Sequence, residues 1–129
     1  MNKTSLIIII LILAAFSFLF ILGSKNNTNN STPIENGEII NGIQYITINA
    51  GGGYTPRISS AKAGIPTKLI VKTNGTYDCS SALVIRSLGF QKILPQTGKT
   101  EIDLGTPKAG TPLQGVCGMG MYNFIINFK

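Results

Sequence analysis

The distribution of apolar residues divides the chain into two parts with different patterns. From Leu6 to Leu22 every residue except Ser17 is apolar, which predicts a helix of roughly 26 Å, within the usable range of a membrane span. This run is longer than the apolar core of a cleaved signal peptide and has no small-x-small site at its end. Residues 1–23 are therefore interpreted as an uncleaved N-terminal transmembrane anchor, with a signal peptide as the alternative.

The segment that follows the apolar run has a composition typical of a tether. Residues 24–37 are dominated by Asn, Thr and Ser, and such a segment cannot bury enough apolar surface to offset the entropy cost of ordering it. We expect a flexible linker. Lys3 precedes the apolar run and Lys25 follows it, so the charge bias is weak. The simplest arrangement is a single-pass plasma-membrane protein with its domain on the extracellular face.

Residues 38–129 lack helical periodicity and instead show short runs rich in β-branched residues, separated by Gly, Pro and Asn. This pattern predicts an all-β fold, a small antiparallel Greek-key sandwich of six to eight strands. The expected strands are Ile39–Asn49, Arg57–Ala61, Thr67–Lys72, Leu83–Ile85, Thr100–Leu104, Leu113–Cys117 and Tyr122–Phe128. A sandwich of this size has a thin core, which a metal or a disulfide would help to stabilise.

Charge and composition exclude two classes of function. The formal charge is +6, but the Lys and Arg residues are scattered singly, without the basic cluster and interleaved aromatics typical of nucleic-acid binding. The chain has no histidine and only five carboxylates, which form no evident pair. Without an imidazole to act as a base or to activate a thiol, an enzyme is not expected.

The candidate chemistry lies in a sulfur-rich segment near the C-terminus. Cys117, Met119 and Met121 alternate with glycine, and Cys79 is the second cysteine of the chain. Beyond Met1 the chain has no other methionine. Thiolates and thioethers are soft ligands. These four residues therefore form a candidate site for a soft metal ion.

The available donors decide which metal is expected. Structural zinc usually takes four Cys or His ligands, and blue copper needs two imidazoles; the chain offers two cysteines and no histidine. Two thiolates and two thioethers suit Cu(I). The main alternative is a membrane-tethered structural or adhesive module in which Cys79 and Cys117 form a disulfide and no metal binds. A small electron carrier is a third possibility.

Several segments together resemble a known family. They are Gly53-Tyr54-Thr55-Pro56, Ala63-Gly64-Ile65-Pro66, Cys79 followed by Leu83-Val84-Ile85, Gly89 to Pro95, and the closing Cys-Gly-Met-Gly-Met-Tyr at residues 117–122. Over about residues 43–129 the chain resembles cupredoxin-fold domains that lack the blue-copper ligands. With the N-terminal anchor it is similar to the membrane-anchored Cu(I) chaperones of Gram-positive bacteria that accompany a copper-exporting P-type ATPase.

The resemblance implies a function and a ligand set. It implies a copper chaperone for copper homeostasis and resistance, in which Cys79, Cys117, Met119 and Met121 hold one or two Cu(I) ions. The ion would pass by ligand exchange to the ATPase or to another copper protein. We expect a monomer attached to the membrane, with no nucleic-acid partner.

Two further features need an interpretation. Leu94 to Gly98 spells LPQTG, the LPxTG signal of sortases, but the apolar segment and basic tail that such a signal requires do not follow it, so a turn is expected. Asp78 is expected to be a solvated loop acid beside Cys79. Tyr54 and Tyr122 are expected to belong to the core or its rim.

Overall fold

The structure is a computed structural model that describes residues 2–23 and 32–129. It contains two compact units, which divide between Asn30 and Ser31. Most of the expected linker, residues 24–31, lies outside the described residues. Each unit is considered by itself.

The N-terminal unit is a single helix, α1 (Lys3–Gly23), where the sequence predicted one. The apolar run contains no Pro and no Gly, and Ile is its only β-branched residue type. Nothing in it therefore interrupts a helix. Within the described part of the chain, no helix meets the combined length and apolarity required of a candidate membrane span.

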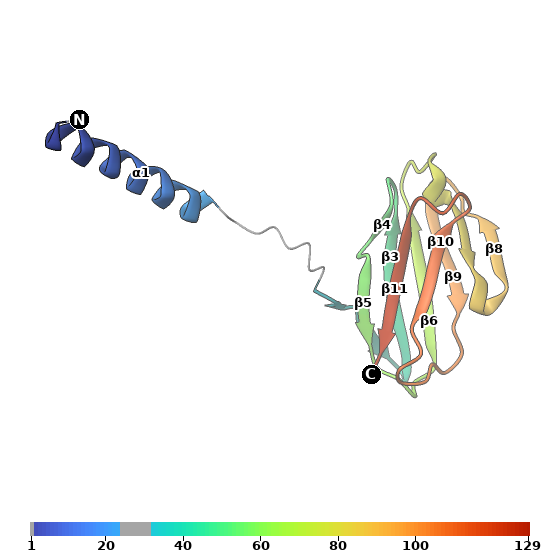
Figure 1. Ribbon diagram of the computed structural model, residues 1–129. Coiled ribbons are helices and arrows are strands. Elements are labelled where there is room, and N and C mark those ends of the chain that lie inside the picture. The colour runs from blue at the N-terminus through green and yellow to red at the C-terminus, as the bar shows by residue number, and fades with distance from the viewer. Residues whose placement is uncertain (1, 24–31) are drawn as a thin grey trace. The chain divides into compact units, whose positions relative to one another are not determined.

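The C-terminal unit is a β-sandwich of two sheets, shown in Figure 1. One sheet has the order β1-β5-β11-β10-β7-β8, and the other has the order β2-β3-β6-β9 with β4 paired to β3. The strands are β1 (Ile34–Glu35), β2 (Gly37–Ile40), β3 (Ile43–Ala50), β4 (Tyr54–Thr55), β5 (Ile58–Ala61), β6 (Thr67–Thr73), β7 (Ala82–Ile85), β8 (Phe90–Ile93), β9 (Gly98–Asp103), β10 (Leu113–Cys117) and β11 (Asn123–Phe128). Two short 3-10 helices, η1 (Cys79–Ser81) and η2 (Arg86–Leu88), flank β7.

Strand pairing corrects the expectation of an antiparallel fold. β3 pairs with β6 in parallel, and β5 lies parallel to both β1 and β11. A parallel pair requires a crossover connection rather than a tight hairpin. The chain from β3 to β6 passes through β4 and β5, and this crossover moves it to the opposite sheet and back. Local sequence patterns predict strands but do not report which distant strand is the neighbour.

The core fills the space between the two sheets. Side chains alternate between buried and exposed positions along β6, β10 and β11, as expected for strands with one buried face. The fully buried Phe124 packs edge-to-face on Tyr54, with ring centroids 5.1 Å apart. Gly115 lies beneath the Phe124 ring, where a Cβ atom would come within 2.2 Å of it. This glycine lets β10 pass close to the centre of the core.

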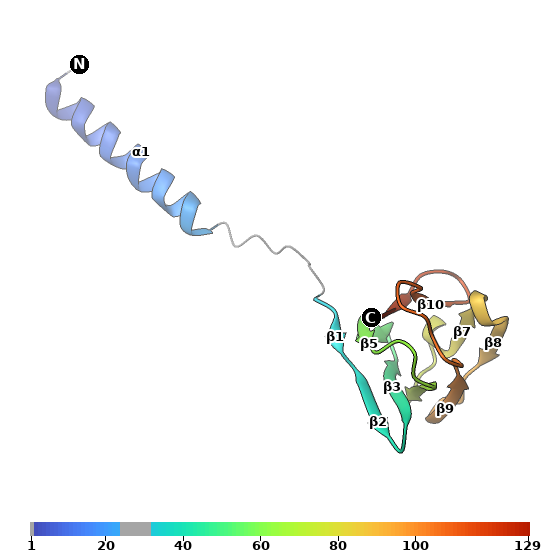
Figure 2. The same ribbon diagram turned by 90° about the horizontal axis from the view of Figure 1, so that it is seen from below.

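The strands differ from those predicted in three main ways, apart from shifts of one or two residues at several strand ends and the unpredicted two-residue strand β4. The expected strand Ile39–Asn49 is a hairpin of β2 and β3, which turns at Asn41 and Gly42 with positive φ at both residues (Figure 2). An Asn-Gly pair between alternating apolar residues is a strong hairpin signal. β8 was not predicted. β1 and the start of β2 lie within residues 24–37, so the sheet begins earlier than the expected domain boundary at residue 38.

The LPQTG segment connects β8 to β9. Leu94 is buried in the core, and its amide donates to the Ser81 carbonyl at 2.7 Å. Pro95, Gln96 and Thr97 are exposed, and Gly98 is already the first residue of β9, where it pairs with Thr73. The segment therefore forms a turn between two strands of the domain, as expected.

Candidate metal centre

Cys117 is the last residue of β10 and lies at one end of the sandwich. Along this strand Leu113, Gly115 and Cys117 are the buried positions, so the cysteine side chain faces the core and is 1% exposed. Cys117 is also the register partner of Leu83 on β7. The burial follows from the alternation of the strand.

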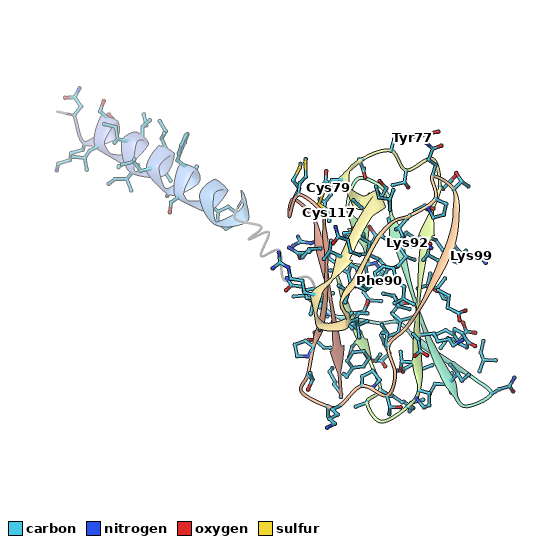
Figure 3. All side chains as sticks on the ribbon, turned by 90° about the vertical axis from the view of Figure 1, so that its right-hand side faces the viewer. Tyr77, Cys79, Phe90, Lys92, Lys99 and Cys117 are labelled. Atoms are coloured by element: carbon cyan, nitrogen blue, oxygen red, sulfur yellow. A yellow bond between two sulfur atoms is a disulfide. The ribbon has the colours of Figure 1, made fainter. Side chains whose placement is uncertain are left out.

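Cys79 reaches the same place from the loop that follows β6. It opens η1, is half-buried and packs against the edge of the core. The Cα atoms of Cys79 and Cys117 are 5.6 Å apart, and their sulfurs are joined as a disulfide (Figure 3). The structure thus brings together two of the four predicted ligands, in the oxidised form that the alternative interpretation anticipated.

Met119 and Met121 are placed differently from the cysteines. They lie on the turn between β10 and β11, which is closed by a hydrogen bond from the Cys117 amide to the Tyr122 carbonyl at 2.9 Å. The Met119 and Met121 side chains are 76% and 62% exposed. The chain forms a tight turn here, with positive φ at Gly120. Both thioethers lie at the surface next to Cys117 in sequence.

The sulfur-bearing turn is tied to its neighbours by backbone contacts. The Gly118 amide donates to the Ala82 carbonyl at 2.8 Å, and the Gly120 amide donates to the Cys117 carbonyl at 2.8 Å. The Tyr122 amide points at Cys117 Sγ at 3.4 Å. These contacts hold the Cys117 sulfur against the backbone of the turn.

Asp78 is an exposed loop acid, as expected, and its hydrogen bonds also organise the loop that carries Cys79. Its Oδ1 accepts hydrogen bonds from the Ser80 amide and hydroxyl, and its Oδ2 accepts one from the Gly52 amide. These bonds cap η1 and join the loop that carries Cys79 to the glycine turn before β4. The hydrogen bond from the Ser80 hydroxyl is the main cause that lowers the pKa of Asp78. The sequence signal was an Asp one residue before a short helical turn.

Tyr54 holds the same loop in place through a hydrogen bond. It is buried, and its hydroxyl donates to the Ser80 carbonyl at 3.0 Å. Burial, with a smaller contribution from the negative charge of Asp78, raises the pKa of Tyr54 to about 12. Tyr122 is half-buried at the rim, and its ring lies over Gly53, where a Cβ atom would be 3.5 Å away. Both tyrosines take the core and rim positions expected of them.

The donor set limits what the centre can bind. In the part of the chain that the structure describes, no group of three or more His, Cys, Asp or Glu residues converges on a common point. The adjacent donors are therefore sulfurs: two from the cysteines once they are reduced, and two thioethers on the neighbouring turn. Soft ligands of this kind suit Cu(I) rather than zinc or Cu(II).

Comparisons with known proteins agree with this fold. The chain is similar to the metal-binding domain of the Cu(I)-exporting P-type ATPase CopA of Streptococcus pneumoniae, whose crystal structure contains Cu(I). The identity is 24% and the TM-score 0.66, over 76% of this chain and 97% of that one. It is also similar to a copper-binding protein whose solution structure was determined in the apo form, with 22% identity and a TM-score of 0.67 over 78% of this chain and 100% of that one.

At these identities the two structures show a shared fold. A comparison with curated protein sequences finds no match. The family that describes cupredoxin-like domains matches residues 9–126, most of the sequence. This chain therefore belongs to the cupredoxin-like domain family.

Proposed function

We propose that this protein is a Cu(I)-binding copper chaperone. The observation that carries the proposal is the approach of Cys79 and Cys117, with Cα atoms 5.6 Å apart, beside a turn that exposes Met119 and Met121. These are the four residues that were predicted from the sequence to be soft metal ligands. The fold shared with copper-binding domains adds support.

Copper binding would require the reduced form of the protein. The thiolate, not the disulfide, is the metal ligand. Reduction of the Cys79–Cys117 bond by an external dithiol, which is itself oxidised to a disulfide, supplies two electrons and two protons and yields two thiols at one end of the sandwich. Binding of Cu(I) then displaces the thiol protons, so apparent affinity rises with pH until both thiols are ionised. One or two Cu(I) ions fit this count of four sulfurs.

The different exposure of the four sulfurs suggests a route for transfer. Cys117 is almost fully buried, whereas both methionines are exposed. A partner's ligand can approach the methionine side and bind before a cysteine leaves, so the ion need not pass through water. The protein transfers an ion in this scheme and is not an enzyme. A copper-exporting P-type ATPase or another copper protein is the proposed acceptor, in copper homeostasis and resistance.

The proposal places the chaperone at the plasma membrane as a monomer. Its support is the sequence of the apolar run, in which Ser17 alone is polar between Leu6 and Leu22. A single-pass anchor with the β-domain outside would hold the copper centre near a membrane transporter and raise its effective concentration there. Carbonate extraction of membranes and protease accessibility of the β-domain test this part separately.

A structural or adhesive module remains a second candidate, because the structure contains the disulfide that such a module would use. In that case the bond would remain intact under cellular conditions and the methionines would have no metal to bind. A thiol-trapping assay on freshly lysed cells separates the two candidates. The chaperone exposes two reactive thiols when copper is removed, and the structural module exposes none.

The decisive experiment is an anaerobic titration of the reduced full chain in detergent with Cu(I) held by a competing chelator. Wild type is expected to withdraw Cu(I) from the chelator. Cys117→Ser is expected to weaken binding by more than about a hundredfold, because one of the two thiolates is lost. Met119→Ala combined with Met121→Ala should weaken it less.

The matched control is Ser81→Ala, which alters the same loop without removing a sulfur. It is expected to bind as wild type does. Equal and weak binding by wild type and Cys117→Ser would overturn the chaperone proposal. Oxidised wild type, with its disulfide intact, is expected to bind no tighter than the Cys117→Ser variant.

A further inference from the structure

Two lysines face each other on the outer side of the five-stranded sheet. Lys72 on β6 and Lys99 on β9 are direct register partners in an antiparallel pair, and both are exposed. Side chains directly opposite on such strands have Cβ atoms only about 5 Å apart. Two like charges at this distance repel each other, so the arrangement is unfavourable unless something neutralises them.

The carboxylates of this face lie toward the other end of the same strands. Glu101 bonds to Lys68 at 2.5 Å, which is the one ion pair recorded among residues 2–23 and 32–129. Glu101, by its hydrogen bond and its charge, and Asp103, more weakly, raise the pKa of Lys68. Lys68 and Asp103 are themselves register partners. The charges are therefore matched at one end of the face and unmatched at the end that carries Lys72 and Lys99.

A cavity of about 490 Å³ adjoins this lysine pair. It is lined by both lysines and by a set of small polar residues and backbone from three connections: Asn49, Ala50, Gly51, Thr55, Thr73, Asn74, Thr97 and Gly98. Amide and hydroxyl groups can donate to an oxyanion, and no carboxylate belongs to the lining. The cavity thus combines two cations with neutral donors.

The wall of the cavity is held in place by its own hydrogen bonds. The Gly75 amide donates to Thr97 Oγ1 at 3.0 Å. Thr73 Oγ1 donates to the Gly98 carbonyl at 3.4 Å, and Thr76 Oγ1 donates to the Ala50 carbonyl at 2.6 Å. These contacts join the ends of β3, β6 and β9 into one preorganised rim. A preorganised site loses less entropy when a ligand binds.

We propose that this cavity, which we call the lysine-pair site, binds a phosphate group between Lys72 and Lys99. A dianionic oxyanion neutralises both ammonium groups and accepts hydrogen bonds from the surrounding hydroxyls and amides. Inorganic phosphate supplies such a dianion, and the phosphodiester headgroup of an anionic phospholipid offers the same acceptor oxygens with a single negative charge. The site uses none of the four sulfurs, so it is a second binding function and does not depend on the copper proposal.

The first test compares phosphate with chloride at equal ionic strength and pH, using the full chain in neutral detergent. Thermal unfolding of the β-domain is followed by tyrosine fluorescence. Phosphate is expected to raise the unfolding midpoint of wild type above its value in chloride, because a ligand that binds the folded state stabilises it. Equal midpoints in the two salts would overturn the proposal.

Lysine variants test whether the effect of phosphate on the unfolding midpoint arises at the lysine-pair site. Lys72→Gln and Lys99→Gln should each weaken phosphate binding by at least about tenfold, because one of two charge-assisted hydrogen bonds is lost. Each should also raise the midpoint in chloride by removing the repulsion. The matched control is Lys92→Gln, which removes the same charge from exposed β8 in the other sheet. If all three variants respond to phosphate alike, screening of net charge explains the effect and the site does not exist.

A second measurement distinguishes the two sources of phosphate. Lysines of the full chain are labelled with an acylating reagent, first with inorganic phosphate and then in bilayers with or without phosphatidylglycerol in phosphatidylcholine. Selective protection of Lys72 and Lys99 by inorganic phosphate identifies a free oxyanion as ligand. Protection that appears only with phosphatidylglycerol identifies a headgroup. Protection in neither arm, or equal protection of Lys92, overturns the proposal.

Discussion

The two sides of the candidate metal centre are built in opposite ways. On one side, Cys79 lies in a loop fixed by the Asp78 carboxylate and the Tyr54 hydroxyl, and it meets the buried Cys117. On the other side, Met119 and Met121 extend from a tight turn into solvent. The comparison teaches that burial and side-chain hydrogen bonds hold the cysteine side in place, whereas the methionine turn is fixed only through its backbone and leaves both methionine side chains exposed to solvent.

This contrast predicts that perturbing the cysteine side changes stability, whereas perturbing the methionine side changes the binding and exchange of added Cu(I) with little effect on stability. The largest effect is expected from the disulfide. Cys79 and Cys117 are separated by 38 residues, and closing a loop of this length stabilises a fold by about 4 kcal/mol in the chain-entropy treatment. Reduction should lower the free energy of unfolding by this amount, as measured by urea denaturation with and without reductant.

The control for that measurement is the double variant Cys79→Ser with Cys117→Ser, whose stability should not respond to reductant. Adding Cu(I) to the reduced wild type should restore part of the lost stability, because the ion binds the folded state. A reductant effect in the double variant, or none in wild type, would contradict the assigned role of the bond.

The next effect in size is expected from Asp78→Ala. This change removes the acceptor for the Gly52 amide and for the Ser80 amide and hydroxyl. The urea midpoint should fall, by less than on reduction of the disulfide. Amide hydrogen exchange at Gly52 and Ser80 should accelerate by roughly tenfold as the bonds are lost. Glu35→Ala, which removes an exposed carboxylate on β1, is the control and should leave both amides unchanged.

Tyr54→Phe is expected to lower the free energy of unfolding by about 1 kcal/mol, because the buried Ser80 carbonyl loses its donor. The pH dependence gives a sharper test. Since the pKa of Tyr54 in the folded protein is raised to about 12, against about 10 when unfolded, the stability from its neutral form is complete below pH 10 and is lost as pH rises toward 12.

Urea denaturation of wild type and Tyr54→Phe across this alkaline range should therefore show a steeper loss of stability in wild type. Parallel curves would mean that the phenol is not held neutral in the fold. Tyr77→Phe serves as the control at neutral pH, because Tyr77 is 76% exposed and its hydroxyl should contribute little.

The smallest effect on stability is expected from Met119→Ala combined with Met121→Ala. Exposed side chains away from special contacts usually change stability by less than about 0.5 kcal/mol. The same variant should slow the exchange of Cu(I) with a thiol-bearing acceptor, measured by stopped-flow mixing. A large loss of stability in this variant would remove the distinction between the two sides of the centre.

Local patterns in the sequence predicted the helix, most strands and the sulfur cluster. β10 and β11 are examples, since their alternation reports a half-buried strand without reference to other segments. The parallel pairing of β3 with β6 could not be predicted from such patterns, because it depends on contacts across the whole fold. The hairpin at Asn41-Gly42 was predictable from the dipeptide and was missed, since the apolar residues on both sides were joined into one strand.

The site shows the same division. Cys79 and Cys117 could be selected from residue type alone, and their proximity follows from the resemblance to cupredoxin-fold domains. The capping role of Asp78 has a local signal, because the residue directly precedes η1. Its bond to Gly52 and the bond of Tyr54 to Ser80 could not be selected, because each joins two separate segments of the chain. Lys72 and Lys99 are 27 residues apart in sequence, and nothing in the sequence distinguishes them from the other scattered cations. Only the register of β6 and β9 makes them neighbours.

The burial of Leu94 has a consequence for how the LPQTG segment would respond to a transpeptidase. A transpeptidase that recognises LPxTG must take the pentapeptide as an extended strand into its cleft. In the native domain the leucine is anchored in the core, and the glycine lies in β9 and pairs with Thr73 of β6, so we expect folded molecules to resist such an enzyme. Unfolded molecules would expose the LPQTG sequence. Cleavage by such an enzyme would then report which molecules are unfolded.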